Sequence, residues 1–84
     1  MNMFLGTIER ITTRSLFGSP HMPVLVLRIR VEPLYQSYFG HTNTVELTGS
    51  LKDACLSLEI GQRVKVEKNV CHIPVTVEKV HDVK

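Results

Sequence analysis

Apolar and polar residues alternate in several short segments of this chain, and the clearest alternation covers residues 24–31. Successive side chains of a β-strand point to opposite faces, so a period of two indicates a strand with one buried face. We expect the buried face to carry Leu25, Leu27, Ile29 and Val31. Arg28 and Arg30 then share the outer face of the same strand.

Similar patterns predict two further strands in the first half of the chain. Residues 4–16 are rich in Ile and Thr, and residues 17–23 contain Gly, Ser and Pro, which reverse a chain, so we predict a long first hairpin. Residues 34–43 are polar and aromatic, and they end in turn-forming residues, which indicates a loop or an irregular extension. Residues 44–48 alternate again, with Val45 and Leu47 expected to point inward.

A short amphipathic helix is expected after Gly49. Ser50, followed three residues later by Asp53, resembles a capping box at a helix start. Apolar residues at helical spacing come next, and they are Leu51, Ala54, Cys55 and Leu58. Gly61 ends the segment.

Two more strands complete the pattern. Residues 62–68 alternate, with Val64 and Val66 on the inner face. In residues 73–78 the apolar Ile73, Val75 and Val77 alternate with Pro74, Thr76 and Glu78, which predicts a fifth strand. Pro74 has no amide hydrogen, which favours an edge position for this strand. The predicted order of elements is therefore β-β-β-α-β-β.

The composition is that of one small folded domain spanning residues 1–84. A chain of 84 residues is too short for two cores, and its 43% hydrophobic and 21% charged residues are ordinary values for a globular protein. The N-terminus has no signal-peptide pattern, and no apolar stretch approaches the ~20 residues of a membrane span. We therefore expect a cytoplasmic protein in which Cys55 and Cys71 are reduced core residues.

Three segments resemble the framework of OB-fold single-stranded DNA-binding proteins of bacteria, and of primosomal replication protein N in particular. They are residues 6–10 (GTIER), residues 45–49 (VELTG) and residues 58–66 (LEIGQRVKV). The resemblance implies a mainly β fold, a five-stranded OB-type Greek-key barrel with one short helix between strands 3 and 4. It also implies a role in DNA replication. The chain departs from the family in having no Trp, a short connection around Asn69 and no acidic tail.

Candidate binding residues lie on the predicted outer face and in the aromatic segment. Single-strand binders combine a cationic groove with rings that stack on bases. The candidates for nucleic-acid binding are Arg10, Arg14, Arg28, Arg30, Tyr35, Tyr38, Phe39, Arg63 and Lys65. The alternatives are solvated arginines paired with carboxylates such as Glu32, Glu46 or Glu67, and rings that cap the core or form a subunit contact.

The lead hypothesis is a non-catalytic module that binds single-stranded DNA or RNA and forms a homodimer. The net charge of +2 is small for a nucleic-acid binder, which favours the rival hypothesis of a protein-interaction or assembly module on an OB-type scaffold. We expect no metal site, because Cys71 and His72 are consecutive and point to opposite faces of a strand. The chain has no phosphate loop, nucleophile elbow or carboxylate pair, so we expect neither an enzyme nor a cofactor.

Overall fold

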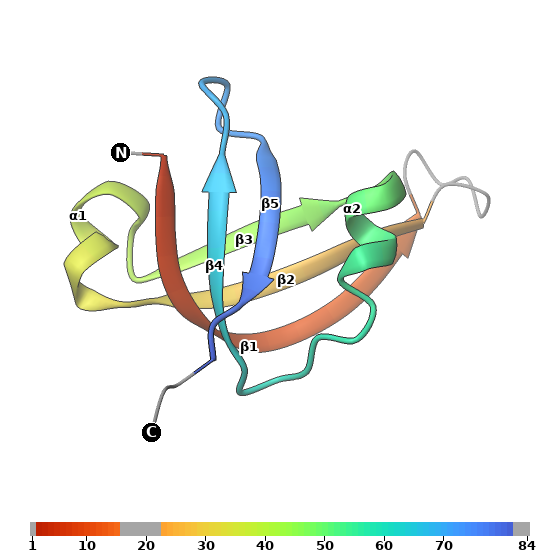
Figure 1. Cartoon of the computed structure of the whole chain (residues 1–84), viewed down its shortest axis with the longest axis horizontal. Coiled ribbons are helices and arrows are strands. Elements are labelled where there is room, and N and C mark those ends of the chain that lie inside the picture. The colour runs from red at the N-terminus through yellow and green to blue at the C-terminus, as the bar shows by residue number, and fades with distance from the viewer. Residues whose placement is uncertain (1, 16–22, 82–84) are drawn as a thin grey trace.

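Five antiparallel strands form one sheet with the order β3-β2-β1-β4-β5 in this computed structural model, which describes residues 2–15 and 23–81 (Figure 1). The bounds of the strands are β1 (Met3–Ser15), β2 (Pro23–Val31), β3 (Thr42–Leu47), β4 (Arg63–Lys68) and β5 (Pro74–Lys79). The helical segments are η2 (Pro33–Tyr35), α1 (Gln36–Phe39) and α2 (Gly49–Ala54). The fold is thus mainly β, with α2 between β3 and β4, as the sequence pattern predicts.

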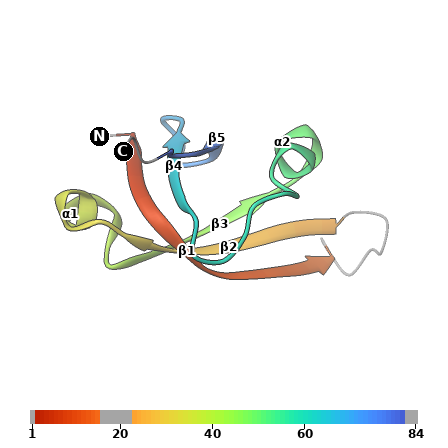
Figure 2. The same cartoon turned by 60° about the horizontal axis from the view of Figure 1, so that its bottom comes forward.

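The long strand β1 organises the sheet because it pairs with two partners. It pairs with β2 from Gly6 to Ser15 and with β4 from Met3 to Thr7. The register shifts between Ile8 and Arg10, and an extra residue of this kind bends a strand. The bend carries β4 and β5 over one face of β2 and β3 (Figure 2).

The space between these two parts of the sheet holds the core. The alternating residues that the sequence predicts to be inside are buried in β2, β3 and β4, and they include Leu27, Ile29, Leu47, Val64 and Val66. Phe4 and Ile8 of β1 join them, and so does Cys55 after α2. Burial of this apolar surface is the main term that stabilises the fold.

Gly6 lies where β1 and β2 pack closely together. A Cβ atom at this position would lie 2.5 Å from the Ile29 Cγ2 atom and 2.6 Å from the Arg30 carbonyl oxygen. No real side chain tolerates such contacts, so the close packing of the two strands requires glycine here.

The structure corrects several expectations about the second half of the chain. Of the three alternating apolar residues at the last strand, Val77 packs against the core, whereas Ile73 and Val75 are 56% and 48% exposed. Strand β5 is an edge strand, and its first part lies beyond the core. Cys71 is also exposed, because it lies in the turn between β4 and β5 rather than in a strand.

Two local predictions about helices are also wrong. The N-cap of α2 is Thr48, without a side-chain hydrogen bond, so Ser50 lies inside the first turn and forms no capping box. The segment after Pro33 is not irregular but consists of η2 and α1.

The predicted turn at residues 17–23 lies almost entirely outside the described residues. Among the helices that the structure describes, none is long and apolar enough to span a membrane.

Candidate nucleic-acid interface

Strand register brings three arginines together on the outer face of the sheet. Arg28 of β2 is paired in register with Arg10 of β1 and with Thr44 of β3. Arg30 follows two residues later on the same face of β2, beside Thr7 and Thr42. We call Arg10, Arg28 and Arg30 the arginine patch. The sequence predicts the members of this patch, and the structure supplies their arrangement.

The arginine patch is only partly neutralised by carboxylates. The Arg28 Nε atom lies 3.6 Å from the Glu9 Oε2 atom. Within residues 2–15 and 23–81, no carboxylate forms an ion pair with Arg10 or Arg30. Arg10 and Arg28 also place like charges opposite each other across two strands, an arrangement that is unfavourable until an anion joins it.

The other predicted cations are held in ion pairs. Arg14 of β1 is bonded to Glu46 of β3. Arg63 of β4 donates two hydrogen bonds, of 2.6 and 2.8 Å, to the carboxylate of Glu32. These hydrogen bonds lower the pKa of the Glu32 carboxyl group, against the opposing effect of its burial. For Arg14 and Arg63 the carboxylate pairing that the sequence left as an alternative is what the structure contains.

Lys65 has a similar partner on its own strand. Its Nζ atom lies 3.1 Å from the Glu67 Oε1 atom, and this contact raises the pKa of the Lys65 ammonium group. The charge of Lys65 is therefore neutralised by an ion pair, whereas Arg10 and Arg30 have no such partner among the described residues.

An open hollow of 370 Å³ lies within the outer face, next to the arginine patch. Its lining residues are Arg10, Thr12, Val26, Arg28 and Thr44. Sequence reasoning found the two arginines but missed Thr12, Val26 and Thr44. Threonine and valine are ordinary strand residues, and only the register of three strands brings these particular ones side by side.

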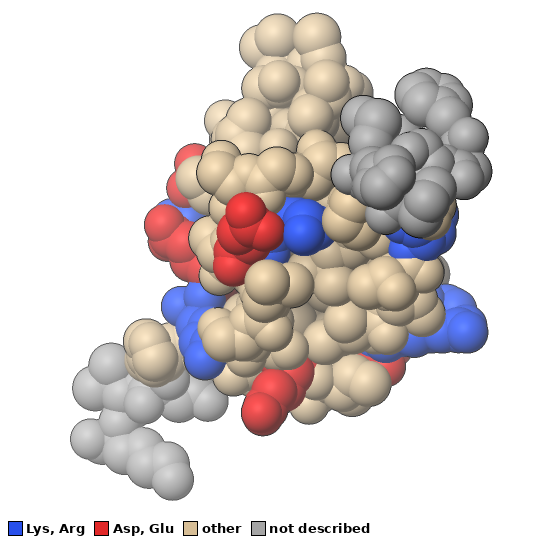
Figure 3. All heavy atoms as spheres, turned by 90° about the vertical axis from the view of Figure 1, so that its right-hand side faces the viewer, with Lys and Arg blue, Asp and Glu red and all other residues tan. Residues whose placement is uncertain are grey.

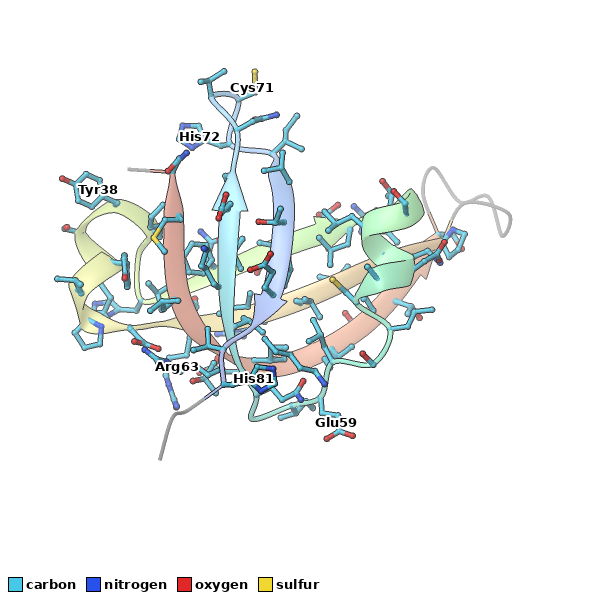
Figure 4. All side chains as sticks on the ribbon, in the orientation of Figure 1. Tyr38, Glu59, Arg63, Cys71, His72 and His81 are labelled. Atoms are coloured by element: carbon cyan, nitrogen blue, oxygen red, sulfur yellow. The ribbon has the colours of Figure 1, made fainter. Side chains whose placement is uncertain are left out.

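The three aromatic residues of the α1 region have different environments. Tyr38 is 65% exposed and points away from the strands into solvent (Figure 4). Tyr35 and Phe39 are half-buried against the core. The Phe39 ring packs on the Phe4 ring at a centroid distance of 4.8 Å. Tyr38 is thus the one ring of the three that lies mainly in solvent.

Lys68, which sequence reasoning did not single out, is a half-buried cation at the end of β4. Its Nζ atom donates a hydrogen bond of 2.9 Å to the Asn43 Oδ1 atom and lies 5.8 and 6.0 Å from the ring centroids of Phe4 and Phe39. Burial lowers the pKa of this ammonium group. The aromatic faces and the amide oxygen take the place of a carboxylate partner.

The turn between β4 and β5 forms an uncharged, apolar end of the molecule. Residues 69–77 contain no Lys, Arg, Asp or Glu, and this end is the uniformly tan projection at the top of Figure 3. Val70 is 97% exposed. The Asn69 Oδ1 atom accepts hydrogen bonds from the backbone N–H groups of Cys71 and Ile73, which fix the turn. We call Val70, Ile73 and Val75 the apolar hairpin tip.

The described part of the chain contains no cluster of side chains that could ligate a metal ion. No group of three His, Cys, Asp or Glu side chains within residues 2–15 and 23–81 is placed to hold a metal ion. Cys55 is buried, which raises the pKa of its thiol, and Cys71 lies exposed at the hairpin turn.

No protein-family model, curated protein or solved structure matches this chain. The most distinctive surface of the described residues is the outer face of the sheet, where Arg10 and Arg30 have no carboxylate partner among those residues and an open hollow lies beside them.

Proposed function

We propose that this chain is a non-catalytic single-stranded nucleic-acid binding module on an OB-type Greek-key barrel, and that the arginine patch is its binding face. The observation that carries the proposal is the position of Arg10 and Arg30 on one face of β1 and β2 without a carboxylate partner among the described residues. Guanidinium groups bind phosphate in a bidentate manner and stack on bases.

The order of the strands supports the OB-type part of the proposal. Strand β1 pairs with both β2 and β4, and α2 connects β3 to β4. In an OB-type barrel the face of the second and third strands commonly binds oligonucleotides. The arginine patch lies on β1 and β2, next to β3, which is the region where that fold places its ligand.

A single strand suits this face better than a duplex. The arginine patch is small, and the helices that the structure describes have at most six residues, too few to fill a major groove beside it. Guanidinium planes and the exposed Tyr38 ring offer stacking surfaces, which unpaired bases use.

Fluorescence anisotropy of a labelled oligothymidine, titrated with the protein across a salt series, tests the proposal. We expect micromolar or tighter dissociation constants at low salt that weaken as salt rises, because binding releases counterions. Oligouridine in a parallel titration distinguishes DNA from RNA as the preferred ligand. Absence of binding at low salt, or equal affinity for a duplex of the same length, contradicts the proposal.

The apolar hairpin tip supports a second candidate function, a protein-interaction module that assembles with itself. Three exposed aliphatic residues in the β4–β5 turn and at the start of β5, together with the edges of β3 and β5, form surfaces that self-association would cover. Sedimentation of the wild type and of a Val70→Ser, Ile73→Ser variant tests this candidate. A homodimer that becomes a monomer in the variant supports it, and a wild-type monomer at every concentration excludes it.

A further inference from the structure

The hollow beside the arginine patch has walls of three chemical kinds. Val26 is half-buried and forms an apolar wall, Thr12 and Thr44 contribute hydroxyl groups, and Arg10 and Arg28 contribute guanidinium groups. None of these five side chains forms a hydrogen bond to another of the five. Apart from the ion pair of Arg28 with Glu9, their polar groups are therefore available to a ligand.

Register fixes where each kind of group stands. Arg10, Arg28 and Thr44 form one row across β1, β2 and β3. Thr12 and Val26 form the next row, about 7 Å away along the strands, at ~3.3 Å per residue. The charged groups thus lie mainly at one end of the hollow, and the apolar surface lies at the other.

We propose that this hollow is a subsite for one nucleotide of the bound strand, with the phosphate at the guanidinium groups of Arg10 and Arg28 and the base against Val26. The inference rests on the proposed function and adds that the protein contacts a base, not only the phosphate backbone. The volume of 370 Å³ lies near the lower end of the range of about 300–1,000 Å³ found for small-molecule sites.

A nucleotide matches all three kinds of wall, and simpler ligands do not. A free phosphate uses only the guanidinium groups and leaves Val26 and the hydroxyls without a role. An apolar ligand would desolvate two arginines without compensation. A base has an apolar face for Val26 and polar edges for hydroxyl groups that both donate and accept hydrogen bonds.

The neighbouring ion pairs divide the roles of the two arginines. Arg28 is tethered by Glu9 at 3.6 Å, which favours a fixed guanidinium plane, whereas Arg10 has no carboxylate partner among the described residues. Glu46 is paired in register with Val26, and Arg14 forms an ion pair with this carboxylate.

Paired titrations of oligothymidine and of an abasic oligonucleotide of the same length test the subsite. The two ligands carry the same phosphates and differ only in their bases. We expect the wild type to prefer oligothymidine by at least about fivefold, which corresponds to the low end of the stacking energy per base.

Variant Val26→Gln fills the hollow without changing the charge of the protein. We expect it to lose the preference for oligothymidine while its affinity for the abasic oligonucleotide stays within about twofold of wild type. Leu56→Gln, a similar change at an exposed aliphatic residue outside both the arginine patch and the apolar hairpin tip, is the matched control and retains the preference. Thr12→Val, an isosteric change that suits a strand, gives a second variant if Val26→Gln does not fold, and it weakens the preference.

Each outcome bears either on the base contact in the hollow or on the proposed binding of a single strand. Equal affinity of the wild type for both oligonucleotides overturns the subsite and leaves phosphate binding by the arginine patch intact. A preference that survives in Val26→Gln and in Thr12→Val also overturns it, and assigns the base contact to another place such as Tyr38. Competition by oligoglutamate as strong as by oligothymidine overturns it in favour of an acidic peptide. Absence of binding to either oligonucleotide refutes the proposed function itself.

Discussion

Arg10 and Arg28 are opposite each other in the register of β1 and β2. This pairing of like charges has opposite consequences for the stability of the fold and for the proposed binding of phosphate. Like charges directly opposite in a sheet repel, whereas two adjacent guanidinium groups attract a phosphate. Natural binding sites often retain such unfavourable pairs, because the ligand removes the repulsion.

Replacement of Arg10 by Thr therefore separates the two effects. We expect Arg10→Thr to raise the free energy of unfolding by about 0.2–1 kcal/mol at low salt, because it removes the repulsion and suits a strand. The same variant should bind oligothymidine more weakly. Urea unfolding at low and high salt measures the stability change, with Lys79→Thr in the edge strand β5 as a control. A less stable Arg10→Thr variant contradicts the assignment of repulsion.

Glu32 and Arg63 show the opposite behaviour, since their charges stabilise the fold. The hydrogen bonds from Arg63 lower the pKa of the Glu32 carboxyl group in the folded protein. A lowered folded-state pKa contributes stability above the ordinary pKa of the carboxyl group, and this stability is lost as the pH falls through the folded-state value.

Variant Glu32→Gln should therefore be less stable than wild type at neutral pH and nearly equal to it in acid. Both side chains are about one-third exposed, so we expect a difference of at most about 1 kcal/mol at neutral pH. Urea unfolding at pH 7 and at pH 3 measures it. A stability difference that is the same at both pH values contradicts the role of this ion pair.

At the scale of elements, the close contact of β1 with β2 depends on Gly6. Variant Gly6→Ala places a methyl group 2.5 Å from Ile29 and 2.6 Å from the Arg30 carbonyl oxygen. The strands must separate to accept it, so we expect a loss of about 1–3 kcal/mol in the free energy of unfolding. Thermal unfolding of Gly6→Ala and of Thr12→Ala, an exposed position on the same strand, makes the comparison. Equal melting temperatures contradict the crowding.

The strands were predictable from the sequence because each has a period of two that is visible locally. Val45, Leu47, Val64 and Val66 are buried as this period predicts. The partners of β1 were not predictable, since the register shift after Ile8 depends on long-range packing. The exposure of Ile73 and Val75 was missed for a related reason, because alternation identifies a face but not whether other elements cover it.

The candidate site was predictable in its charges but not in its shape. Arg28 and Arg30 share a face by the simple alternation of β2, whereas the neighbours of Arg28 depend on the register of three strands. The sequence alone also does not show which of the six candidate cations have a carboxylate partner. The structure separates Arg10 and Arg30 from Arg14, Arg63 and Lys65, which have carboxylate partners at close range.

At the scale of the whole molecule, a net charge of +2 conceals an uneven distribution of charge. The arginine patch concentrates cations on the outer face of β1 and β2, and the apolar hairpin tip has no charged residue. The local field near a surface, not the net charge, steers an anionic ligand. The two surfaces lie on different strands, so one chain has room for a nucleic-acid contact and a protein contact.

The proposed function requires that arginines without carboxylate partners among the described residues bind the phosphates of a single strand. The most direct measurement is the salt dependence of oligothymidine affinity for wild type, for Arg30→Ala and for Lys79→Ala, each of which removes one cation. We expect Arg30→Ala to weaken binding and to reduce the slope of log K against log salt by about 0.7, the value for one phosphate contact of a single strand. Lys79→Ala should leave the slope unchanged. Equal losses of affinity in both variants, or an unchanged slope in Arg30→Ala, would contradict the proposed role of the arginines.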